Sequence, residues 1–411
     1  MTPHHLAARF AGADRIRDEI AARPADAADH VAQTRRTVDT YHPRRLDLRV
    51  ERVVDETPST RTFRLRRPDG TDLPPFLAGQ YVGVFTDGTN RPYAISSSPV
   101  DLSHYDLTVR RVPGGRISNH LLDTLATGHP LTTTGPQGTF HHNPLFHGED
   151  VVFLAGGSGV APAMSMVREV ADRGLDRRFH LLYGSRSLDD VPFRAELDAL
   201  AADRPGIRVH HVLQEPDPRW QGPTGLLTAA LVTQLAGPLD GRMVYVCGPQ
   251  ALYPYALGQL TERLGHPRRR IRFEANGAPA DPTRQPHWPA GADPAEQVTV
   301  AARGTAFRTP RSRPLLDALE DAGIRPESAC RSGECGLCRV RVLKGEVHHA
   351  EEARLRLSDP DSGYAHACVA YPLTDVELDV WGRAKTGRAW PYVRTSVVRT
   401  RGSGSNIHRF R

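Results

Sequence analysis

The stretch Cys330-Arg331-Ser332-Gly333-Glu334-Cys335-Gly336-Leu337-Cys338 places three cysteines at the spacing C-x4-C-x2-C, and Cys368 follows after 29 intervening residues. This is the ligand spacing of a plant-type [2Fe-2S] cluster, in which four thiolates hold two irons. Gly333 and Gly336 let the backbone fold close enough for its N–H groups to reach the sulfurs. A zinc site is the alternative, although zinc sites usually pair two C-x2-C units. We therefore expect one [2Fe-2S] cluster with four metal ligands: Cys330, Cys335, Cys338 and Cys368.

The composition indicates a multidomain globular protein. The chain has 411 residues, which is long for a single core. Of the five cysteines, only Cys247 lies outside the cluster pattern, so no disulfide is expected and a reducing cytoplasm fits. No apolar run approaches the ~20 residues of a membrane span, and the N-terminus lacks a secretory h-region.

The charge is concentrated at the C-terminus. The net charge is +6, but residues 383–411 hold eight basic residues and no acidic residue, which leaves about −2 for the rest. No basic nucleic-acid-binding module is recognisable, so a nucleic-acid role is not expected. We expect residues 383–411 to form a mobile basic tail that docks an acidic partner, or a passive solvated tail.

The hydrophobic pattern divides the chain into segments. Residues 1–45 have loose helical spacing and predict a helical N-terminal extension packed on the domains. Residues 46–146 alternate between apolar and polar, which predicts a small antiparallel β-barrel with one helix at 116–125. Residues 147–275 alternate short apolar runs with helical stretches, as in a doubly wound α/β domain. Residues 276–295, rich in Pro, Gly and Ala, predict a linker. Residues 296–382 predict a small α+β domain around the cysteine loop.

The barrel segment contains Arg91-Pro92-Tyr93-Ala94-Ile95-Ser96. Arg91 can bind a phosphate through charge-assisted hydrogen bonds, and Tyr93 can stack on an isoalloxazine ring. The stretch resembles the R-x-Y-[ST] flavin motif of the ferredoxin-NADP reductase family. In that family the fourth position supplies a hydroxyl near flavin N5, but here it is Ala94. The resemblance implies that this contact comes from the backbone or from Ser96.

Two more stretches resemble motifs of the same family. Gly114-Gly115-Arg116-Ile117-Ser118 resembles its G-x-x-S segment, in which glycine-rich backbone and a helix start hold the flavin phosphates. Gly135-Pro136-Gln137-Gly138-Thr139-Phe140 resembles the turn that closes the barrel. The expected flavin-binding residues are therefore Arg91, Tyr93, Ala94, Ile95, Ser96, Gly115, Arg116, Ile117 and Ser118.

The α/β segment contains Gly156-Gly157-Ser158-Gly159-Val160-Ala161-Pro162 between a strand and a helix. Glycines there let a pyrophosphate approach the N–H groups of the helix N-terminus. Val246-Cys247-Gly248-Pro249 resembles the family's C-G-P motif beside the nicotinamide, although Cys247 can also be a buried small residue. Glu274 ends the last strand, where a carboxylate near the nicotinamide is as plausible as a surface glutamate. Cys247 and Glu274 are therefore the candidate catalytic residues.

The nicotinamide cofactor is less clear from the sequence. Arg186 can hold an NADP 2′-phosphate, whereas Glu215 repels a phosphate and can bond a ribose hydroxyl. We favour NADH, with NADPH as the alternative, and FAD over FMN from the wording of the barrel motif. The expected nucleotide-binding residues are Gly156, Gly157, Ser158, Gly159, Pro162, Ser185, Arg186, Cys247, Gly248 and Pro249.

The domain order resembles that of ferredoxin-NADP reductase superfamily flavin reductases with a C-terminal plant-type ferredoxin, such as the phthalate dioxygenase reductase and phenylacetyl-CoA epoxidase reductase types. The resemblance implies a β-grasp fold for residues 296–382. It also implies an NAD(P)H-dependent oxidoreductase that passes electrons through flavin and cluster, one at a time, to a partner oxygenase or other metalloenzyme. The alternatives are a redox sensor, an electron-transfer subunit of a fixed complex, and a free flavin or quinone reductase with a vestigial cluster.

Overall fold

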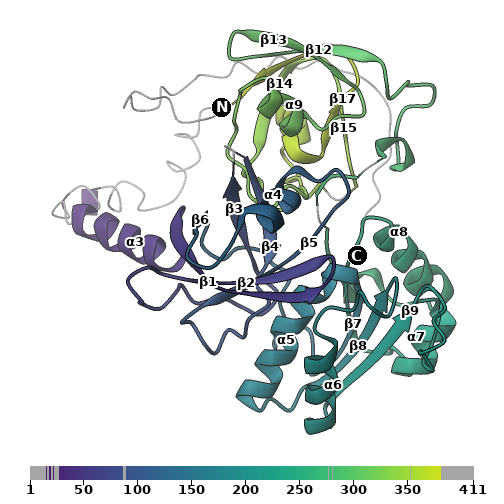
Figure 1. Ribbon diagram of the computed structural model, residues 1–411. Helices are drawn as coiled ribbons and strands as arrows, with labels where there is room; N and C mark the ends of the chain where they lie inside the picture. The colour runs from purple at the N-terminus through teal and green to yellow at the C-terminus, as the bar shows by residue number, and fades with distance from the viewer. Residues whose placement is uncertain are drawn as a thin grey trace.

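The computed structural model describes residues 15, 18, 19, 22, 27–86, 89–275, 277–279, 281–351 and 353–380. The predicted basic tail, residues 383–411, lies outside the described residues, and so do most residues of the predicted helical extension before residue 27. The β-barrel lies between the C-terminal domain and the α/β domain (Figure 1). No helix among the described residues is long and apolar enough to cross a membrane.

The N-terminal helix α3, Ala27–Tyr41, projects from the barrel (Figure 1). Its residues 32–41 are exposed. The expectation that this segment packs on the domains is therefore wrong for residues 32–41, whereas Pro43 accepts a hydrogen bond from the Gly135 N–H at 2.7 Å and Arg45 lies over the Phe85 ring of the barrel.

The barrel is a six-stranded antiparallel sheet in the order β4-β3-β6-β1-β2-β5. A bridge between Ile95 and Leu107 joins its two edges and closes it. Along β1, Leu46, Leu48 and Val50 alternate with exposed residues, because successive side chains point to opposite faces of a strand. The strands are β1 Leu46–Thr57, β2 Thr60–Arg66, β3 Tyr81–Thr86, β4 Thr89–Ala94, β5 Tyr105–Arg110 and β6 Pro130–Thr133.

Helix α4, Arg116–Thr124, follows β5. It buries Ile117, Leu121 and Leu122 in the barrel core, at helical spacing. Gly115 precedes it as the N-cap residue, with no side chain to cap the helix. No side chain at the N-cap accepts hydrogen bonds from the first N–H groups of α4, so these groups can donate to a ligand.

The α/β domain has a five-stranded parallel sheet in the order β11-β10-β7-β8-β9. Val151 and Phe153 of β7 pack with one core, and Val152 and Leu154 pack with another. Helices therefore cover both faces, which makes the fold doubly wound. The strands are β7 Asp150–Gly156, β8 Arg178–Ser185, β9 Ile207–Leu213, β10 Met243–Cys247 and β11 Ile271–Glu274, and the helices are α5 Val160–Arg173, α6 Arg194–Asp203, α7 Ala229–Ala236 and α8 Leu252–Leu257.

The C-terminal domain has a mixed five-stranded sheet in the order β13-β12-β18-β14-β16 and a two-stranded sheet of β15 and β17. Helix α9, Leu315–Asp321, buries Leu315, Leu316 and Leu319 in this domain's core. The strands are β12 Gln297–Ala302, β13 Thr305–Pro310, β14 Arg339–Lys344, β15 Val347–His349, β16 Tyr364–His366, β17 Ala370–Pro372 and β18 Val376–Asp379. The sequence pattern did not reveal the short strands β15, β16 and β17.

The segment expected to be a linker packs on the C-terminal domain. The ring of Trp288 meets those of His348 and Tyr371 edge-on, with centroids 5.2 and 6.3 Å apart. The Tyr371 hydroxyl donates to the carbonyl of Pro279 at 3.0 Å. These contacts fix the path of the chain from the α/β domain into the C-terminal domain.

Candidate active site

One cavity of about 800 Å³ is lined by residues of all three domains. The barrel contributes β4 and the start of α4, and the α/β domain contributes the carboxyl ends of its strands. Ligands of doubly wound sheets bind at those carboxyl ends. The predicted site residues that line the cavity are Arg91, Tyr93, Ala94, Gly115, Arg116, Ile117, Ser118, Ser158, Pro162, Cys247, Glu274 and Cys368.

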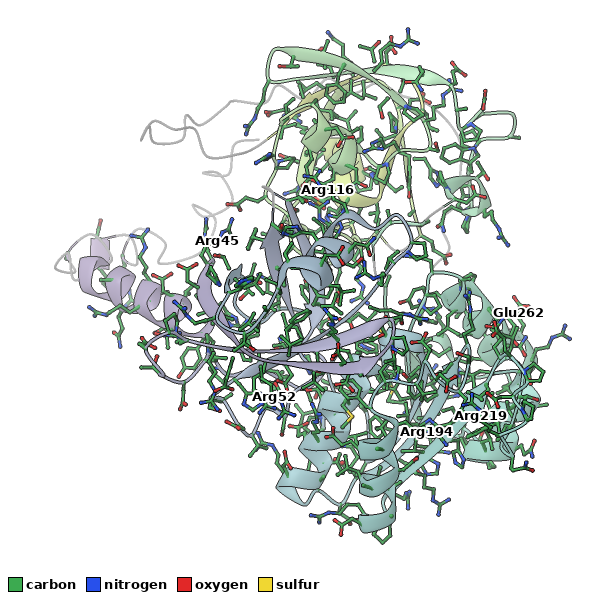
Figure 2. The ribbon with its side chains drawn as sticks, in the orientation of Figure 1. Arg45, Arg52, Arg116, Arg194, Arg219 and Glu262 are labelled. Atoms are coloured by element: carbon green, nitrogen blue, oxygen red, sulfur yellow. The ribbon has the colours of Figure 1, made fainter. Side chains whose placement is uncertain are left out.

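The barrel wall of the cavity is cationic and aromatic. Arg91 and Tyr93 are two residues apart on β4 and therefore share one face of the strand. Arg116 lies on the side of the barrel that faces the C-terminal domain (Figure 2). Burial, with repulsion from Arg331, lowers the pKa of the Arg91 guanidinium. A phosphate group would relieve this repulsion, so the residues fit a flavin whose phosphates lie against Arg91, Arg116 and the α4 N-terminus.

Two predicted flavin residues do not reach the cavity with their side chains. Ile95 is fully buried in the barrel core. The Ser96 hydroxyl donates to the carbonyl of Asp106 at 3.1 Å and lies 3.0 Å from the Thr108 hydroxyl. Of the two sources expected for the contact at flavin N5, the Ser96 hydroxyl is therefore engaged inside the barrel, which favours the backbone. Thr108 lines the cavity instead. Its position two residues before Arg110 on β5 places both side chains on the same face of the strand, which is the sequence feature that indicates it.

Cys247 and Glu274 meet at the carboxyl ends of β10 and β11. The two residues are parallel partners in the sheet, and the Cys247 Sγ lies 3.9 Å from the Glu274 Oε2. The Tyr253 hydroxyl bonds the carbonyl oxygens of Gly248 and Glu274. Burial, with repulsion from Glu334, raises the pKa of the Glu274 carboxyl to about 8. Glu274 is therefore protonated at neutral pH, and this wall of the cavity carries no charge there.

The glycine loop packs directly on the C-G-P loop. A Cβ on Gly159 would lie 2.2 Å from the carbonyl oxygen of Cys247, and one on Gly156 would lie 2.9 Å from Pro249 Cδ. Gly157 has φ +52° and leaves space for the Arg110 guanidinium. The glycines are therefore needed for the close approach of two loops at the strand ends. Gly156, Gly157, Gly159, Gly248 and Pro249 lie behind the cavity wall and do not line it.

Ser185 and Arg186 lie away from this cavity, at the end of β8. The backbone N–H of Glu215 donates to the Arg186 carbonyl at 2.9 Å. The Arg186 Nε lies 3.8 Å from the Glu215 Oε1, and both side chains are exposed. Arg186, which favours NADPH, and Glu215, which favours NADH, therefore form an ion pair with each other.

The four cysteines of the spacing pattern come together in the C-terminal domain. Thiol contacts join Cys330 to Cys335 and Cys368, and Cys338 to Cys368. The N–H of Gly333 donates to the Cys368 Sγ at 3.2 Å, and the N–H of Cys335 to the Cys330 Sγ at 3.3 Å. Four thiols with backbone N–H donors to sulfur suit a [2Fe-2S] cluster, whose sulfurs accept such bonds.

Arg331 joins the cysteine loop to the barrel. Its side chain is buried, and its NH1 lies 3.1 Å from the Asp317 Oδ1. Its NH2 contacts the Glu320 carboxylate and the Thr89 hydroxyl. Its Nε donates to the Asn90 Oδ1 at 3.1 Å, and Asn90 also bonds Ser328. The strand that carries Arg91 and Tyr93 therefore also holds the loop that carries Cys330.

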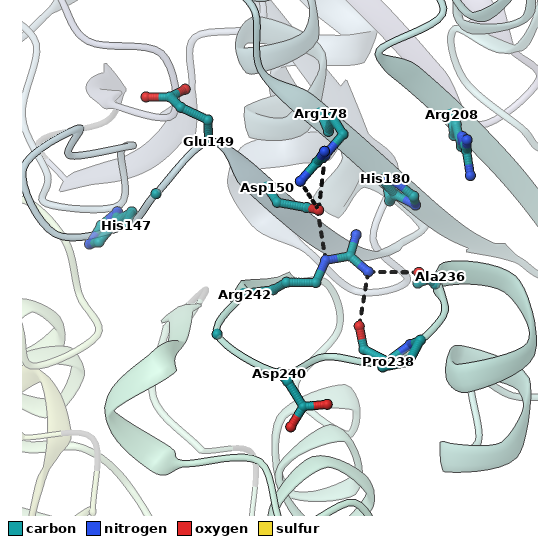
Figure 3. Close-up of a pocket in the computed structure, with 12 residues that line it drawn as sticks. His147, Glu149, Asp150, Arg178, His180, Arg208, Ala236, Pro238, Asp240 and Arg242 are labelled. Atoms are coloured by element: carbon teal, nitrogen blue, oxygen red, sulfur yellow. Dashed lines mark hydrogen bonds and ion pairs between the residues drawn. The ribbon is translucent and has the colours of Figure 1, made fainter.

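A second cavity, of about 620 Å³, lies at the opposite edge of the α/β sheet, where β7 and β8 begin (Figure 3). Three of its charged residues, Asp150, Arg178 and Arg242, are joined by ion pairs. Arg242 bonds Asp150 at 2.7 Å and the carbonyl of Ala236 at 2.6 Å, and Arg178 also pairs with Asp150. None of the predicted site residues lines it.

Three family models match the chain. They are the oxidoreductase FAD-binding domain over residues 47–142, the oxidoreductase NAD-binding domain over 153–257 and the 2Fe-2S iron-sulfur cluster binding domain over 298–373. The glycine betaine monooxygenase reductase subunit of Pseudomonas aeruginosa is 30% identical and covers 84% of this chain and 97% of its own. Phthalate dioxygenase reductase of Burkholderia cepacia is also 30% identical, over 74% of this chain and 86% of its own.

This chain belongs to the phthalate dioxygenase reductase family. The solved structure of phthalate dioxygenase reductase matches it with a TM-score of 0.60 and 28% identity, covering 82% of this chain and 97% of that one. The family match confirms the predicted multidomain fold, with its flavin barrel, doubly wound α/β domain and β-grasp ferredoxin domain. This member is therefore an NAD(P)H-dependent oxidoreductase that uses FAD and one [2Fe-2S] cluster.

The protonated state of Glu274 predicts a pH-dependent stability. The native carboxyl keeps its proton up to about pH 8, whereas the unfolded one loses it near its ordinary value of 4.5. Stability from this group therefore falls as pH rises from 4.5 to about 8 and is level above that. We expect the Tm of Glu274→Gln to rise relative to that of wild type as pH increases across this range, by about 2–4 °C for each kcal/mol of unfolding free energy that wild type loses. Exposed Glu262→Gln is the control, and a Tm difference independent of pH would contradict the buried, protonated carboxyl.

The Asn90 contacts predict a selective electron-transfer defect. Asn90→Ala removes buried hydrogen bonds to Ser328 and Arg331, which are worth about 1–3 kcal/mol to the docked geometry. We expect cluster reduction, followed by stopped flow, to slow by about two- to tenfold, while flavin content and flavin bleaching by NADH stay normal. Thr132→Ala is the control, because the Thr132 hydroxyl on β6 donates to the Asp47 carboxylate of the same barrel at 2.7 Å. Equal rates for Asn90→Ala and wild type would remove this contact from the electron path.

Proposed function

We propose that this oxidoreductase is the reductase component of an oxygenase system and that the three-domain cavity is where its electron path begins. The shared cavity is the observation that supports this most directly. Tyr93, the Cys247–Glu274 pair and the cluster ligand Cys368 all line it. A flavin there would contact both the nicotinamide side and the cluster side, without any movement of the domains.

The residues have separate roles in this proposal. When bound, FAD takes a hydride from the reduced nicotinamide and releases its two electrons singly, and the cluster carries one electron at a time. Arg91 and Arg116 hold the flavin phosphates, and Tyr93 packs on the flavin ring. Cys247 and the protonated Glu274 form an uncharged wall at the nicotinamide side. Arg331 keeps the cysteine loop against the barrel.

We propose NADH as the preferred electron donor. The Glu215 carboxylate forms an ion pair with the Arg186 guanidinium, which is the predicted partner for an NADP 2′-phosphate. A phosphate dianion would have to displace this carboxylate and lie beside it, whereas a ribose hydroxyl could accept from the Arg186 guanidinium or donate to the Glu215 carboxylate. The five reduced cysteines, four of them needed as thiolates, support a reducing compartment such as the cytoplasm.

The modular arrangement predicts that the two half-reactions can be separated. We expect Cys338→Ser to abolish the cluster and cytochrome reduction but to leave flavin bleaching by NADH in stopped flow. The flavin and nucleotide residues belong to other domains, which is why the hydride step should survive. If flavin bleaching is lost as well, the domains do not act separately. If cytochrome reduction survives, the cluster is vestigial and the chain is a free flavin reductase.

The Arg186–Glu215 pair predicts a change of donor preference. We expect a higher kcat/KM for NADH than for NADPH in wild type. Glu215→Arg should lower the NADH-to-NADPH ratio by about tenfold, which corresponds to ~1.4 kcal/mol. Glu262→Arg, an exposed residue elsewhere on the α/β domain (Figure 2), is the matched charge control. A wild-type preference for NADPH would show that Arg186 dominates despite its carboxylate partner.

A further inference from the structure

The cluster loop has one solvent-exposed edge. Cys330, Cys338 and Cys368 are 2–3% exposed, whereas Cys335 is exposed to solvent. Leu337, two residues after Cys335, is 43% exposed. Cys368 lines the flavin cavity, whereas Cys335 is the cluster ligand that reaches solvent. Because electron transfer weakens steeply with distance, an acceptor protein must contact this edge.

Three contacts lead from this edge to a basic surface. Glu334 precedes Cys335 and pairs with Arg354 at 3.2 Å. It also accepts a hydrogen bond from the Thr139 hydroxyl of the barrel's closing turn. The Thr139 carbonyl in turn accepts from the Arg272 NH2 at 2.6 Å. Arg272 belongs to β11, so the cluster edge is continuous with the start of that strand.

The surface around Arg272 is cationic and hollow. A cavity of about 530 Å³ there is lined by three arginines and two histidines, with no carboxylate among the lining residues. His147 lines this cavity and the one in Figure 3. We define the arginine face as Arg268, Arg269, Arg270 and Arg272 together with Leu145 and Phe146.

The charges of the arginine face are not neutralised within the described part of the chain. None of its four arginines has a described carboxylate within 4.0 Å. Arg270 donates to the carbonyl of Gly241 at 2.7 Å, and Arg268 lies over the Phe273 ring. By contrast, exposed Arg219 on the same domain pairs with both Asp189 and Asp217. The arginine face therefore presents its positive charge to the outside.

Apolar side chains complete the arginine face. Leu145 and Phe146 are adjacent and are 82% and 73% exposed. Phe146 lines the same cavity as Arg269, Arg270 and Arg272. Exposed aromatic and arginine side chains together are the composition that protein interfaces favour, and lysine-poor patches of this kind often hold the residues that dominate binding.

We propose that the arginine face and the Cys335–Leu337 edge form one docking surface for an acidic electron-acceptor protein. The acceptor's carboxylates pair with the arginines, and an apolar patch on the acceptor covers Phe146. Its redox centre then lies against the cluster edge. The arginines steer the encounter at long range, and the apolar contact holds the complex. This inference rests on the proposed function, because it requires a protein acceptor for the cluster's electron.

The test uses the full-length holoprotein, so that the basic tail is common to all variants. Reduction of cytochrome b5, an acidic haem protein, and of cytochrome c, a basic one, is measured at low and high salt. Arg268→Glu/Arg269→Glu reverses two exposed charges of the face. We expect it to slow cytochrome b5 reduction at low salt by about tenfold and to speed cytochrome c reduction. Both effects should fade when salt shortens the Debye length to ~3 Å near 1 M.

The control is Arg204→Glu/Arg208→Glu, which reverses two exposed charges, one just before β9 and one in it, at the opposite edge of the sheet from β11; Arg204 pairs with Asp203. Equal effects of the two double variants would show a general charge effect and overturn the docking surface. Rates with both cytochromes that match wild type would overturn it as well. Phe146→Ser should slow cytochrome b5 reduction even at high salt, unlike Leu226→Ser, which removes an exposed apolar side chain outside the arginine face. No effect of Phe146→Ser would exclude the apolar part of the surface.

Flavin bleaching and cluster reduction by NADH, measured without any acceptor, separate this inference from the proposed function. If wild type fails to reduce its own cluster, the proposed function fails. If every variant reduces its cluster normally and the two double variants still behave alike, only the docking surface fails.

Discussion

The arrangement of the domains depends on the contacts of the buried Arg331 guanidinium, which join the cysteine loop to α9 and to the barrel. A cation withdrawn from water must be compensated, and removal of one partner leaves a charge whose burial costs several kcal/mol. Asp317 and Glu320 supply the negative charge from α9, but Asn90 and Thr89 of the barrel complete its hydrogen bonds. The C-terminal domain therefore cannot leave the barrel without exposing or stranding this group. The positive φ of Arg331, +55°, fixes the loop around it.

The shared cavity follows from this constraint. Once β4 is fixed to the cysteine loop, the face of β4 that carries Tyr93 and the ligand Cys368 border the same space. The α/β domain closes that space with Cys247 and Glu274, because parallel strands bring their carboxyl ends to one edge. Burial keeps Glu274 protonated, so the wall formed by Cys247 and Glu274 is neutral, while the barrel wall carries Arg91 and Arg116.

Much of the fold could be predicted from the sequence, because long alternating or apolar runs and glycine motifs are local signals. The runs around Leu48, Val152 and Val209 gave strands, and the cysteine spacing gave the C-terminal domain. The three-residue strands β15, β16 and β17 could not be predicted, because so short a run shows no measurable hydrophobic period and its pairing partners are distant in the sequence. The site was only partly predictable for a similar reason. The sequence identifies Arg186 and Glu215 as opposing candidates at the nucleotide, but their ion pair depends on the register of β8 and β9. Thr108, Asn90 and the role of Arg331 depend on contacts between residues up to 242 positions apart, which no local pattern encodes.

The arginines of this protein divide into two groups with different physical purposes. Those with little exposure, such as Arg331, Arg242 and Arg168, pair with carboxylates, because an unpaired charge at low dielectric is costly. Exposed arginines can stay unpaired, because water solvates them at little cost, and an exposed ion pair adds only about 0–1 kcal/mol. Retaining four arginines in and beside β11 that have no carboxylate partner among the described residues therefore costs the fold almost nothing. Their field extends about one Debye length, ~8 Å at physiological ionic strength, and it lies beside the one exposed cluster ligand. The stability of the fold does not require this arrangement, whereas an acidic acceptor arriving at Cys335 would supply the missing partners.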